Sequence, residues 1–485
     1  MTGTLSSTPS PAAPDRPDAA AVRRTPMGAV LASVAVVEIV SGSLQTFLGP
    51  IFSSLSDSLN VTAAQLNWVS IANLLAGAAF APVLSRLGDL YGHRRVLRWN
   101  LAIMMLGSLL VALGRSFELL LAGQALQGSL TGLFPLLVGI LRNHSSADDN
   151  RHGIGIMAAA LGLGAGLGLV ASGLIVEYAS SPTAALWVPV FMVGVAVGLA
   201  QFVLPETDDR PGGRVDWAGG GLLGAGLVGV LLALSQGPDW GWTQAGTLTA
   251  LIGGLVLLAA FVAVELRHPE PMVNVRMFAD RQVNVISCVA LAFPFSVFGL
   301  LVANAIFLSL PADTFGFGLG LSALNVSFAM LVAIGVAAVG SFCARFIAKA
   351  LGDRSALVIG CTLIAAAYAW TALFHASLAE FLVGQAVAGF GVGMLQQVTR
   401  TIAVEAVPKE ETAVGSGVNE LVITVGGSLG AAVVGAVFTA HTAEGAYVPD
   451  EAGFTLSWWI AAGVPAAAAL VALAYRAPHA KEDSR

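Results

Sequence analysis

The stretch Leu87-Gly-Asp-Leu-Tyr-Gly-His-Arg-Arg-Val-Leu97 adjoins two long apolar runs, residues 63–85 and 95–113. An α-helix needs about 20 mostly apolar residues to cross a bilayer, and both runs approach or exceed that length. Loops on the cytoplasmic side of membrane proteins carry an excess of Lys and Arg. The stretch therefore predicts two membrane-spanning helices joined by a short cytoplasmic turn.

Each polar residue of this turn has a specific physical use. Gly88 and Gly92 permit a tight turn between helices. Asp89 is suited to accept hydrogen bonds at a helix N-terminus or to pair with an arginine of a neighbouring helix. Arg94 and Arg95 anchor the cytoplasmic face. Together the five residues predict a charge latch that opens as two parts of the protein move; the alternative is a loop that only fixes orientation.

The same kind of apolar run recurs along the whole chain, which is 56% hydrophobic and only 11% charged. Soluble domains carry about 25% charged residues, so this composition excludes a soluble protein. The sequence predicts an all-α polytopic membrane protein with fourteen transmembrane helices. The predicted windows are 28–51, 63–85, 95–113, 117–140, 153–175, 184–204, 215–235, 246–266, 283–309, 320–346, 355–374, 378–404, 412–438 and 455–476.

The basic residues provide an independent test of this topology. With both termini in the cytoplasm, the fourteen windows leave 22 of the 23 Lys and Arg residues on the cytoplasmic side, and only Arg115 lies outside. A missed helix would invert the pattern downstream. Residues 1–27 and 477–485 are expected to be cytoplasmic tails, the first of them disordered. Lys and Arg form no dense run, which argues against nucleic acid as a partner.

An internal repeat divides the chain. Residues 121–132 and 382–393 share Leu, Gly, Gln, Ala, Gly and Gly at an offset of 261. Two further matches lie at offsets of 260 and 262, between the loops that begin at Gly92 and Gly352 and between glycines near Gly164 and Gly426. Duplicated halves are common in transporters. The repeat predicts two pseudo-symmetric six-helix bundles, 28–204 and 283–476, with an inserted helix pair in 205–282.

The loop at 87–97 resembles the loop signature of the major facilitator superfamily. The fourteen spans, together with Asp216-Trp217-Ala-Gly219 before the inserted pair, resemble its drug:proton antiporter branch. The resemblance implies a secondary transporter of the bacterial inner membrane, expected to be a monomer. Such a protein exports small amphipathic compounds by alternating access. It uses the proton gradient as its energy source and has no cofactor.

Two helices depart from the pattern of that branch. The run Gly162-Leu-Gly164-Ala-Gly-Leu-Gly168 aligns with a signature that ends in Gly-Pro, but Leu169 follows here. Its small-xxx-small spacing still predicts close helix packing by Gly164, Gly168 and Gly173. Where the family has an Arg in the fourth helix, this chain has Gln124, repeated as Gln385. These two side chains are expected either to face a common cavity or to join neighbouring helices.

One carboxylate lies deep in a predicted span. Glu38 is about ten residues into the first window, near the bilayer midplane, where a charge is costly and usually functional. We predict a proton carrier; the alternative is a structural Glu bonded to an Asn or Gln. Glu420 is the second candidate, although a solvated carboxylate at a helix start would explain it. The predicted substrate cavity comprises Ser41, Gln45, Gln124, Asn304 and Gln385.

Other functions are less compatible with the sequence. The three cysteines lie in apolar runs without paired spacing or a His neighbour, so neither disulfides nor a metal site is expected. No Walker motif is present, which argues against ATP as a direct energy source. A uniporter or importer without tight proton coupling stays open because of Gln124 and Leu169. A receptor or an enzyme would need a soluble domain or a catalytic cluster, and we predict neither.

Overall fold

The computed structural model describes residues 26–475 except for 60–62, 115, 145–146, 179–184, 206–214, 269–270, 272, 274, 280, 408–411 and 444–447. The predicted tails, 1–27 and 477–485, lie outside the described residues apart from Pro26 and Met27. Every regular element in the described part is helical. The chain is therefore an all-α protein over the part that the structure describes.

The helices alternate with short connections. Up to residue 202 they are α1 (Met27–Leu59), α2 (Ala63–Tyr91), α3 (His93–Leu113), α4 (Phe117–Gln127), η1 (Gly128–Gly132), α5 (Leu133–His144), α6 (Ala147–Tyr178) and α8 (Trp187–Phe202). Then follow α9 (Trp217–Trp240), α10 (Ala245–Glu265) and η2 (Val275–Ala279). The remaining helices are α11 (Arg281–Gly299), α12 (Leu301–Ser309), α13 (Ala312–Phe315), α14 (Ala323–Leu351), α15 (Asp353–Leu373), α16 (Leu378–Glu405), α17 (Thr412–Ala440) and α18 (Glu451–Ala472).

Thirteen segments of the described chain are long and apolar enough to cross a membrane. The segments formed by α4, η1 and α5 and by α11 and α12 each count as one. The remaining predicted window, 184–204, contains α8, which has only 16 residues. That is shorter than the ~20 residues of a full span. The structure thus supports a polytopic membrane protein with at least thirteen candidate spans.

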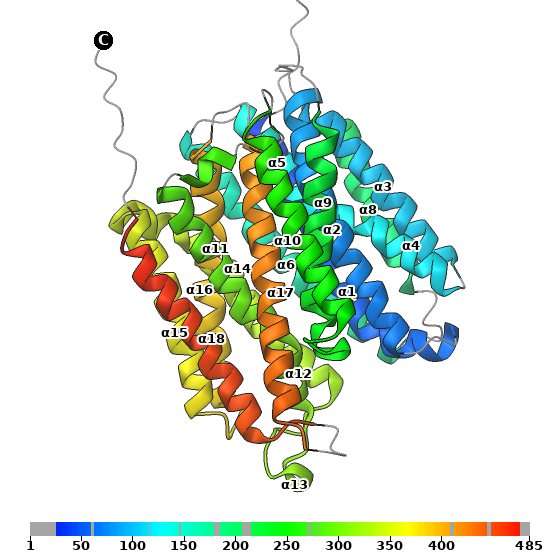
Figure 1. Ribbon diagram of the computed structural model, residues 1–485, viewed down its shortest axis with the longest axis vertical. Coiled ribbons are helices and arrows are strands. Elements are labelled where there is room, and N and C mark those ends of the chain that lie inside the picture. The colour runs from blue at the N-terminus through cyan, green and yellow to red at the C-terminus, as the bar shows by residue number, and fades with distance from the viewer. Residues whose placement is uncertain are drawn as a thin grey trace, which may run out of the picture.

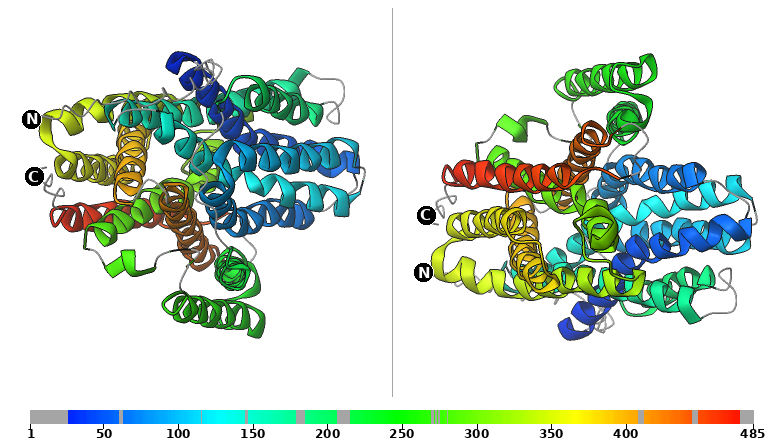
Figure 2. Two further views of the ribbon diagram at one scale, coloured as in Figure 1. Left: turned by 90° about the horizontal axis from the view of Figure 1, so that it is seen from above. Right: turned by 90° about the horizontal axis from the view of Figure 1, so that it is seen from below.

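The helices form two groups that lie side by side (Figure 1). Seen from above and from below, α2 to α4 and α8 lie on one side and α14 to α16 and α18 on the other (Figure 2). We call α1 to α8 the first group and α11 to α18 the second group. The groups are joined by contacts of α6 with α14 and α16, and of α17 with α2 and α5. The α9–α10 hairpin lies outside both groups, and α9 packs on α2 and α17, one helix from each group (Figure 2).

Backbone contacts through glycine recur in both groups. A Cβ at Gly164 or Gly168 of α6 would overlap the carbonyl oxygens of Ile39 and Ser43 of α1. In the second group, Gly426 and Gly430 of α17 lie in the same way against the carbonyl oxygens of Leu291 and Phe295 of α11. Gly173 is different, because an added Cβ would meet only a Leu324 methyl of α14, at 4.0 Å. The α1–α6 and α11–α17 pairs are therefore built alike.

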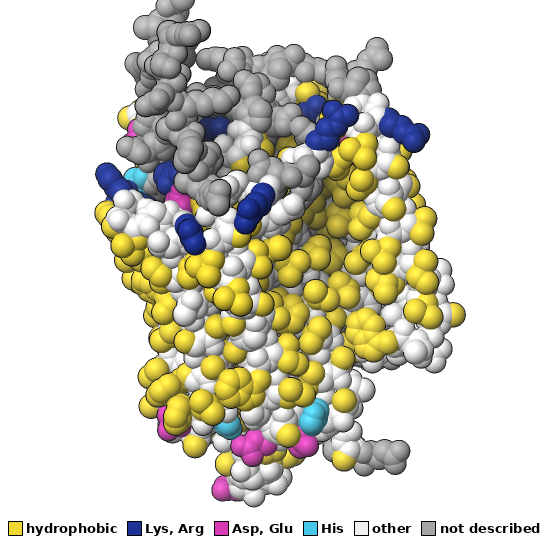
Figure 3. Space-filling model, turned by 60° about the vertical axis from the view of Figure 1, so that its left-hand side comes forward, with side chains coloured by type: hydrophobic (Ala, Val, Ile, Leu, Met, Phe, Trp, Pro, Cys, Tyr) yellow, Lys and Arg dark blue, Asp and Glu magenta, His cyan; other side chains and the backbone are white. Residues whose placement is uncertain are grey.

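Charge separates the two ends of the molecule. On the face shown in Figure 3, apolar side chains cover the middle, and Lys and Arg gather at one end beside a few acidic and His side chains. The charged side chains that show at the other end are acidic residues and His. The turn between α2 and α3, at Gly92, belongs to the end with the Lys and Arg residues, which we call the basic end. Gly92 has φ 96°, and Gly352, in the matching turn between α14 and α15, has φ 84°. Only glycine takes this conformation without strain.

We expect Gly164→Ala to destabilise the protein, because the new methyl group would be forced into the backbone of α1. Overpacking of this kind costs about 1–3 kcal/mol. Gly253→Ala in α10 is the matched control, since nothing lies within 4 Å of its added Cβ. The control is expected to melt at or above the wild-type temperature. Thermal unfolding in detergent measures both, and equal shifts for the two variants would contradict the packing role of Gly164.

Candidate functional site

Glu38 lies on α1 with its side chain wholly inside the protein, at 0% exposure. Neither carboxylate oxygen has a hydrogen-bond partner among the described residues. The α1–α6 backbone contact at Ile39 fixes the rotation of α1. Successive helix residues are about 100° apart, so Glu38 points to one side of this contact rather than directly at α6. Burial of an ionised carboxylate without a partner is costly, so this environment favours the protonated acid.

Arg400 and Glu420 form an ion pair close to Glu38. Arg400, on α16, is only 3% exposed. Its Nε and Nη2 donate to the two carboxylate oxygens of Glu420 on α17, at 2.6 and 3.0 Å. Its Nη1 donates to Gln396 Oε1 at 3.0 Å, and its guanidinium lies 4.3 Å from the ring centre of Phe134 on α5. Both members of the pair interact electrostatically with Glu38.

This ion pair differs from what the sequence suggested for its members. The predicted topology counts Arg400 among the basic residues of the cytoplasmic side, yet it lies buried inside α16, within the predicted span 378–404. Glu420 is bonded to Arg400 and is only 15% exposed at its side chain, so it is not a solvated carboxylate at a helix start. The signal that was available is the position of Arg400 inside the predicted span 378–404, because an ionisable residue within a span is costly and usually functional.

Gln124 belongs to a chain of hydrogen bonds within the first group. Its Nε2 donates to Gln127 Oε1 at 2.8 Å, and Gln127 Nε2 donates to Ser108 Oγ of α3 at 3.1 Å. Asn73 of α2 donates to the carbonyl oxygen of Gln124 at 3.0 Å. These contacts join α2, α3 and α4. Of the two roles expected for Gln124, the geometry favours the joining of helices.

The other predicted cavity residues lie apart from one another. Asn304 accepts a hydrogen bond from Trp458 Nε1 at 3.0 Å, inside an aromatic cluster of the second group. Gln385 is buried, and its Nε2 has no partner among the described residues. Ser41 is buried and Gln45 is exposed, both on α1. The structure does not bring the five residues into one hydrogen-bonded cluster.

Asp89 connects the two groups at the basic end. Its carboxylate accepts hydrogen bonds from the backbone N–H groups of Ala413 and Val414, at 3.1 and 3.0 Å, in the first turn of α17. It also lies 2.9 Å from His93 Nε2. A buried carboxylate at a helix N-terminus is stabilised by unpaired N–H groups and by the helix dipole. This is one of the two uses expected from the sequence.

The rest of the predicted latch acts locally. Gly92 alone makes the turn, whereas Gly88 lies inside α2, where a Cβ would press on Leu136. Arg94 donates to the carbonyl oxygens of Ala200 and Gln201, at 3.1 and 2.7 Å, and so holds the end of α8 within the first group. Arg95 is exposed. Among these residues, Asp89 makes the contact that crosses between the groups.

Two arginines that the predicted topology places on the cytoplasmic side also cross between the groups. Arg142 of α5 donates to the carbonyl oxygens of Val404 and Val407, at 2.7 and 3.0 Å, at the end of α16. Arg151 of α6 donates twice to Glu405, at 2.6 Å each, and twice to Asp353, at 3.2 and 3.3 Å. With Asp89, these contacts close the basic end between the two groups.

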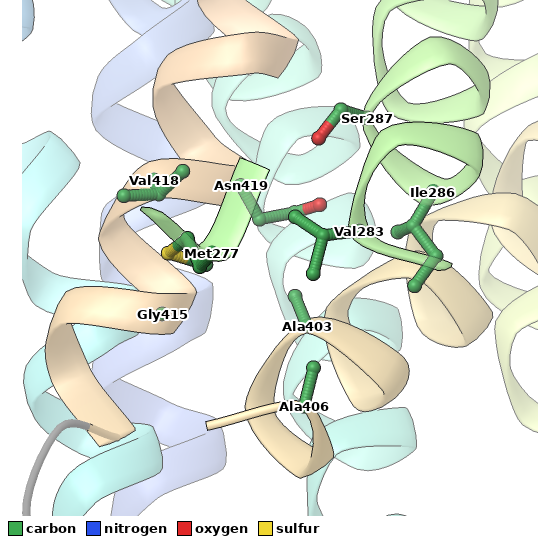
Figure 4. Close-up of a pocket in the computed structure, with 9 residues that line it drawn as sticks. All are labelled: Met277, Val283, Ile286, Ser287, Ala403, Ala406, Gly415, Val418 and Asn419. Atoms are coloured by element: carbon green, nitrogen blue, oxygen red, sulfur yellow. The ribbon is translucent and has the colours of Figure 1, made fainter. Parts of the chain in front are cut away.

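A small pocket, with about 20 Å³ of room for water-sized molecules, lies beside this region, between η2, α11, α16 and α17 (Figure 4). Apolar side chains form most of its wall, and the side chains of Ser287 and Asn419 add oxygen atoms (Figure 4). None of the five predicted cavity residues lines this pocket. In the described part of the chain, no group of three or more His, Cys, Asp or Glu residues is arranged to hold a metal ion.

A sequence model of the major facilitator superfamily matches residues 34–348 and 292–485. The chain belongs to the major facilitator superfamily. Among its relatives, the probable actinorhodin transporter of Streptomyces coelicolor is 27% identical, over 84% of this chain and 71% of that protein. The tetracenomycin C resistance and export protein of Streptomyces glaucescens is 26% identical, over 85% and 74% of the two chains.

The superfamily fold is also found by comparison with solved structures. The crystal structure of the human organic anion transporter MFSD10 matches with a TM-score of 0.66. The alignment covers 92% of this chain and 99% of that one at 15% identity. At such low identity the likeness concerns the fold alone. It agrees with the two helical groups of Figure 2, and the named bacterial relatives belong to the drug-efflux branch.

We expect Arg151→Gln to open the basic end, because it removes charge-assisted hydrogen bonds between α6 and the second group. Spin labels at Arg95 and Lys349, both exposed, report the distance between the groups by pulsed electron resonance. Partly exposed ion pairs are worth up to about 1 kcal/mol, so the open fraction should rise about fivefold. Arg94→Gln is the control, since it removes the bonds to Ala200 and Gln201, which lie within one group. Unchanged distances in Arg151→Gln would refute the latch.

Proposed function

We propose that this protein is a drug efflux transporter that exports small amphipathic molecules in exchange for protons. The observation that carries the proton coupling is Glu38, a buried acid with no hydrogen-bond partner among the described residues. An ionisable group inside a membrane bundle is expensive, and such groups usually serve transport. Membership of the superfamily and the names of its relatives, an actinorhodin transporter and a tetracenomycin C export protein, support export as the direction.

The proposed architecture has fourteen spans, with α8 as the short sixth span. Two six-helix bundles, 28–204 and 283–476, flank the inserted pair in 205–282. The repeated glycine contacts of α6 and α17 support this division. The basic end and both tails face the cytoplasm, in keeping with the positive-inside rule. The protein acts as a monomer in the bacterial plasma membrane.

Transport would proceed by rocking of the two bundles. The contacts of Asp89, Arg142 and Arg151 hold the basic end closed, so the described arrangement suits a state that is shut toward the cytoplasm. In such a state the substrate leaves to the outside and Glu38 takes up a proton. Opening of the basic end breaks these contacts, exposes Glu38 to the cytoplasm and lets the proton leave as a new substrate enters.

A uniporter or importer without tight proton coupling is the second candidate. One observation favours this candidate. Gln124 occupies the position where the family has an arginine, and its side chain is hydrogen-bonded to Gln127, which is bonded in turn to Ser108. An amide cannot influence a carboxylate through charge. This candidate predicts that flux does not respond to a pH gradient.

We expect Glu38→Gln to lose uphill export while it still exchanges substrate. The amide is close in shape to the acid but cannot release a proton, so transport driven by a pH gradient should fall at least tenfold. Substrate counterflow, which needs no net proton movement, should stay within about twofold of wild type. Both are measured in proteoliposomes with a fluorescent amphipathic drug.

Asp313→Asn is the control, since Asp313 is an exposed acid on α13. Undiminished uphill export by Glu38→Gln would remove Glu38 from the coupling step. Wild-type flux that ignores the pH gradient would instead favour the uniporter.

A further inference from the structure

We propose that Arg400 supplies the counter-charge for deprotonated Glu38 while the two groups are together around it, until Glu38 takes up its next proton. Arg400 then acts as a positioning residue that stabilises the ionised form of the buried acid in the closed arrangement. This inference rests on the proposed proton exchange and adds a residue to it. It assigns to α16 a role that the superfamily resemblance places in the fourth helix.

The bonds of Arg400 leave one of its edges suited to this task. Nε and Nη2 are both directed to Glu420, whereas Nη1 is bonded to a neutral amide, that of Gln396. A guanidinium has five N–H donors in a planar fork and stays charged at all relevant pH values. Arg400 can therefore keep one bond to Glu420 and exchange its amide partner for a second carboxylate.

The charge balance of Glu38, Arg400 and Glu420 explains why ionised Glu38 would need the Nη1 edge of Arg400. With Glu38 protonated, Arg400 and Glu420 cancel each other and the cluster is neutral. When Glu38 loses its proton, two carboxylates share one guanidinium, and the net charge is −1. In the low dielectric of a bundle interior that charge is tolerated only if Glu38 gains a charged hydrogen-bond partner.

Glu38 and Arg400 come from different groups but meet in one buried region. Val37, next to Glu38, belongs to the same apolar cluster as Phe134, whose ring lies under Arg400. Val404, one turn beyond Arg400 on α16, belongs to it as well. Movement of the second group away from the first would therefore separate Arg400 from Glu38. The counter-charge is available only while the groups are together in this region.

Among the residues that the structure describes, no other charged group is placed to replace Arg400. The helices packed on α1 are α2, α5, α6 and α8. Of their described charged side chains, Asp89, Arg142 and Arg151 are bonded to α16 or α17 at the basic end. Arg86, Asp149 and His152 stand at that same end of α2 and α6. The charged groups that face Glu38 are thus Arg400 from α16 and Glu420 from α17.

The experiment measures proton release on drug addition to the purified protein in weakly buffered detergent, as a function of pH. Arg400→Gln removes the counter-charge, so the midpoint for release should move to higher pH. Glu420→Gln frees Arg400 for Glu38 and removes a repelling charge, so the midpoint should move to lower pH. Each shift should be about one pH unit or more, the usual effect of a neighbouring charge.

A purely structural ion pair between Arg400 and Glu420 would not move the midpoint for proton release in opposite directions in the two variants. If Arg400 only held α16 to α17, both variants would lose the same contact and change in the same direction, and that result would overturn the proposal. Lys349→Gln, an exposed basic residue of the second group, should leave the midpoint unchanged. The double variant Arg400→Gln/Glu420→Gln avoids an unpaired buried charge if a single variant folds poorly. Its midpoint should stay above that of Glu420→Gln, and an equal value would also overturn the proposal.

Glu38→Gln separates this proposal from the proposed function. If that variant still releases a proton on drug addition, proton exchange at Glu38 is wrong, whatever Arg400 does. If it releases none while the Arg400 and Glu420 variants fail to shift in opposite directions, the proposed function stands and the role of Arg400 falls.

Discussion

The backbone contact between α1 and α6 determines how the rest of the structure is oriented. Gly164 and Gly168 let α6 lie directly on the carbonyl oxygens of Ile39 and Ser43, and no residue with a Cβ could do so. In a bilayer, apolar side chains gain little by leaving lipid, so close packing must supply the attraction between helices. The contact also fixes the rotation of α1. Because Glu38 lies about 100° around the helix from Ile39, that rotation places the acid beside the α6 contact.

Helix α6 has a second face with a small residue, and this face packs against the second group. The packing of α6 is therefore connected with the contacts that close the basic end. Gly166 of α6 lies against Leu331 and Ile334 of α14, across the boundary between the groups. At the start of α6, Arg151 reaches Glu405 and Asp353 of the second group. The tight glycine contact holds α6 to the first group, while its other face and its charged end touch the second. A helix built in this way can stay with one group and release the other.

The sequence predicted the features that depend on a local pattern of residues. It did not predict the positions of side chains that are determined by contacts between distant parts of the chain. Hydropathy located the helices, positive φ at Gly92 follows from the turn that its sequence predicted, and Glu38 stood out as an acid within an apolar run. Arg400 was missed because a hydropathy window averages over one charge near its end. Arg151 was read as a topological signal, since no local feature shows that its helix end meets Glu405 and Asp353.

The place of the buried arginine has a mechanical consequence. An arginine in the fourth helix would lie in the same group as Glu38, so their distance would change little as the groups rock. Arg400 belongs to the other group, and its ring partner Phe134 belongs to the first. The interaction of Glu38 with its counter-charge therefore depends on the relative position of the groups. A coupling mechanism needs this dependence, because the protonation of Glu38 can bias the conformation only if the two states differ in their interaction with it.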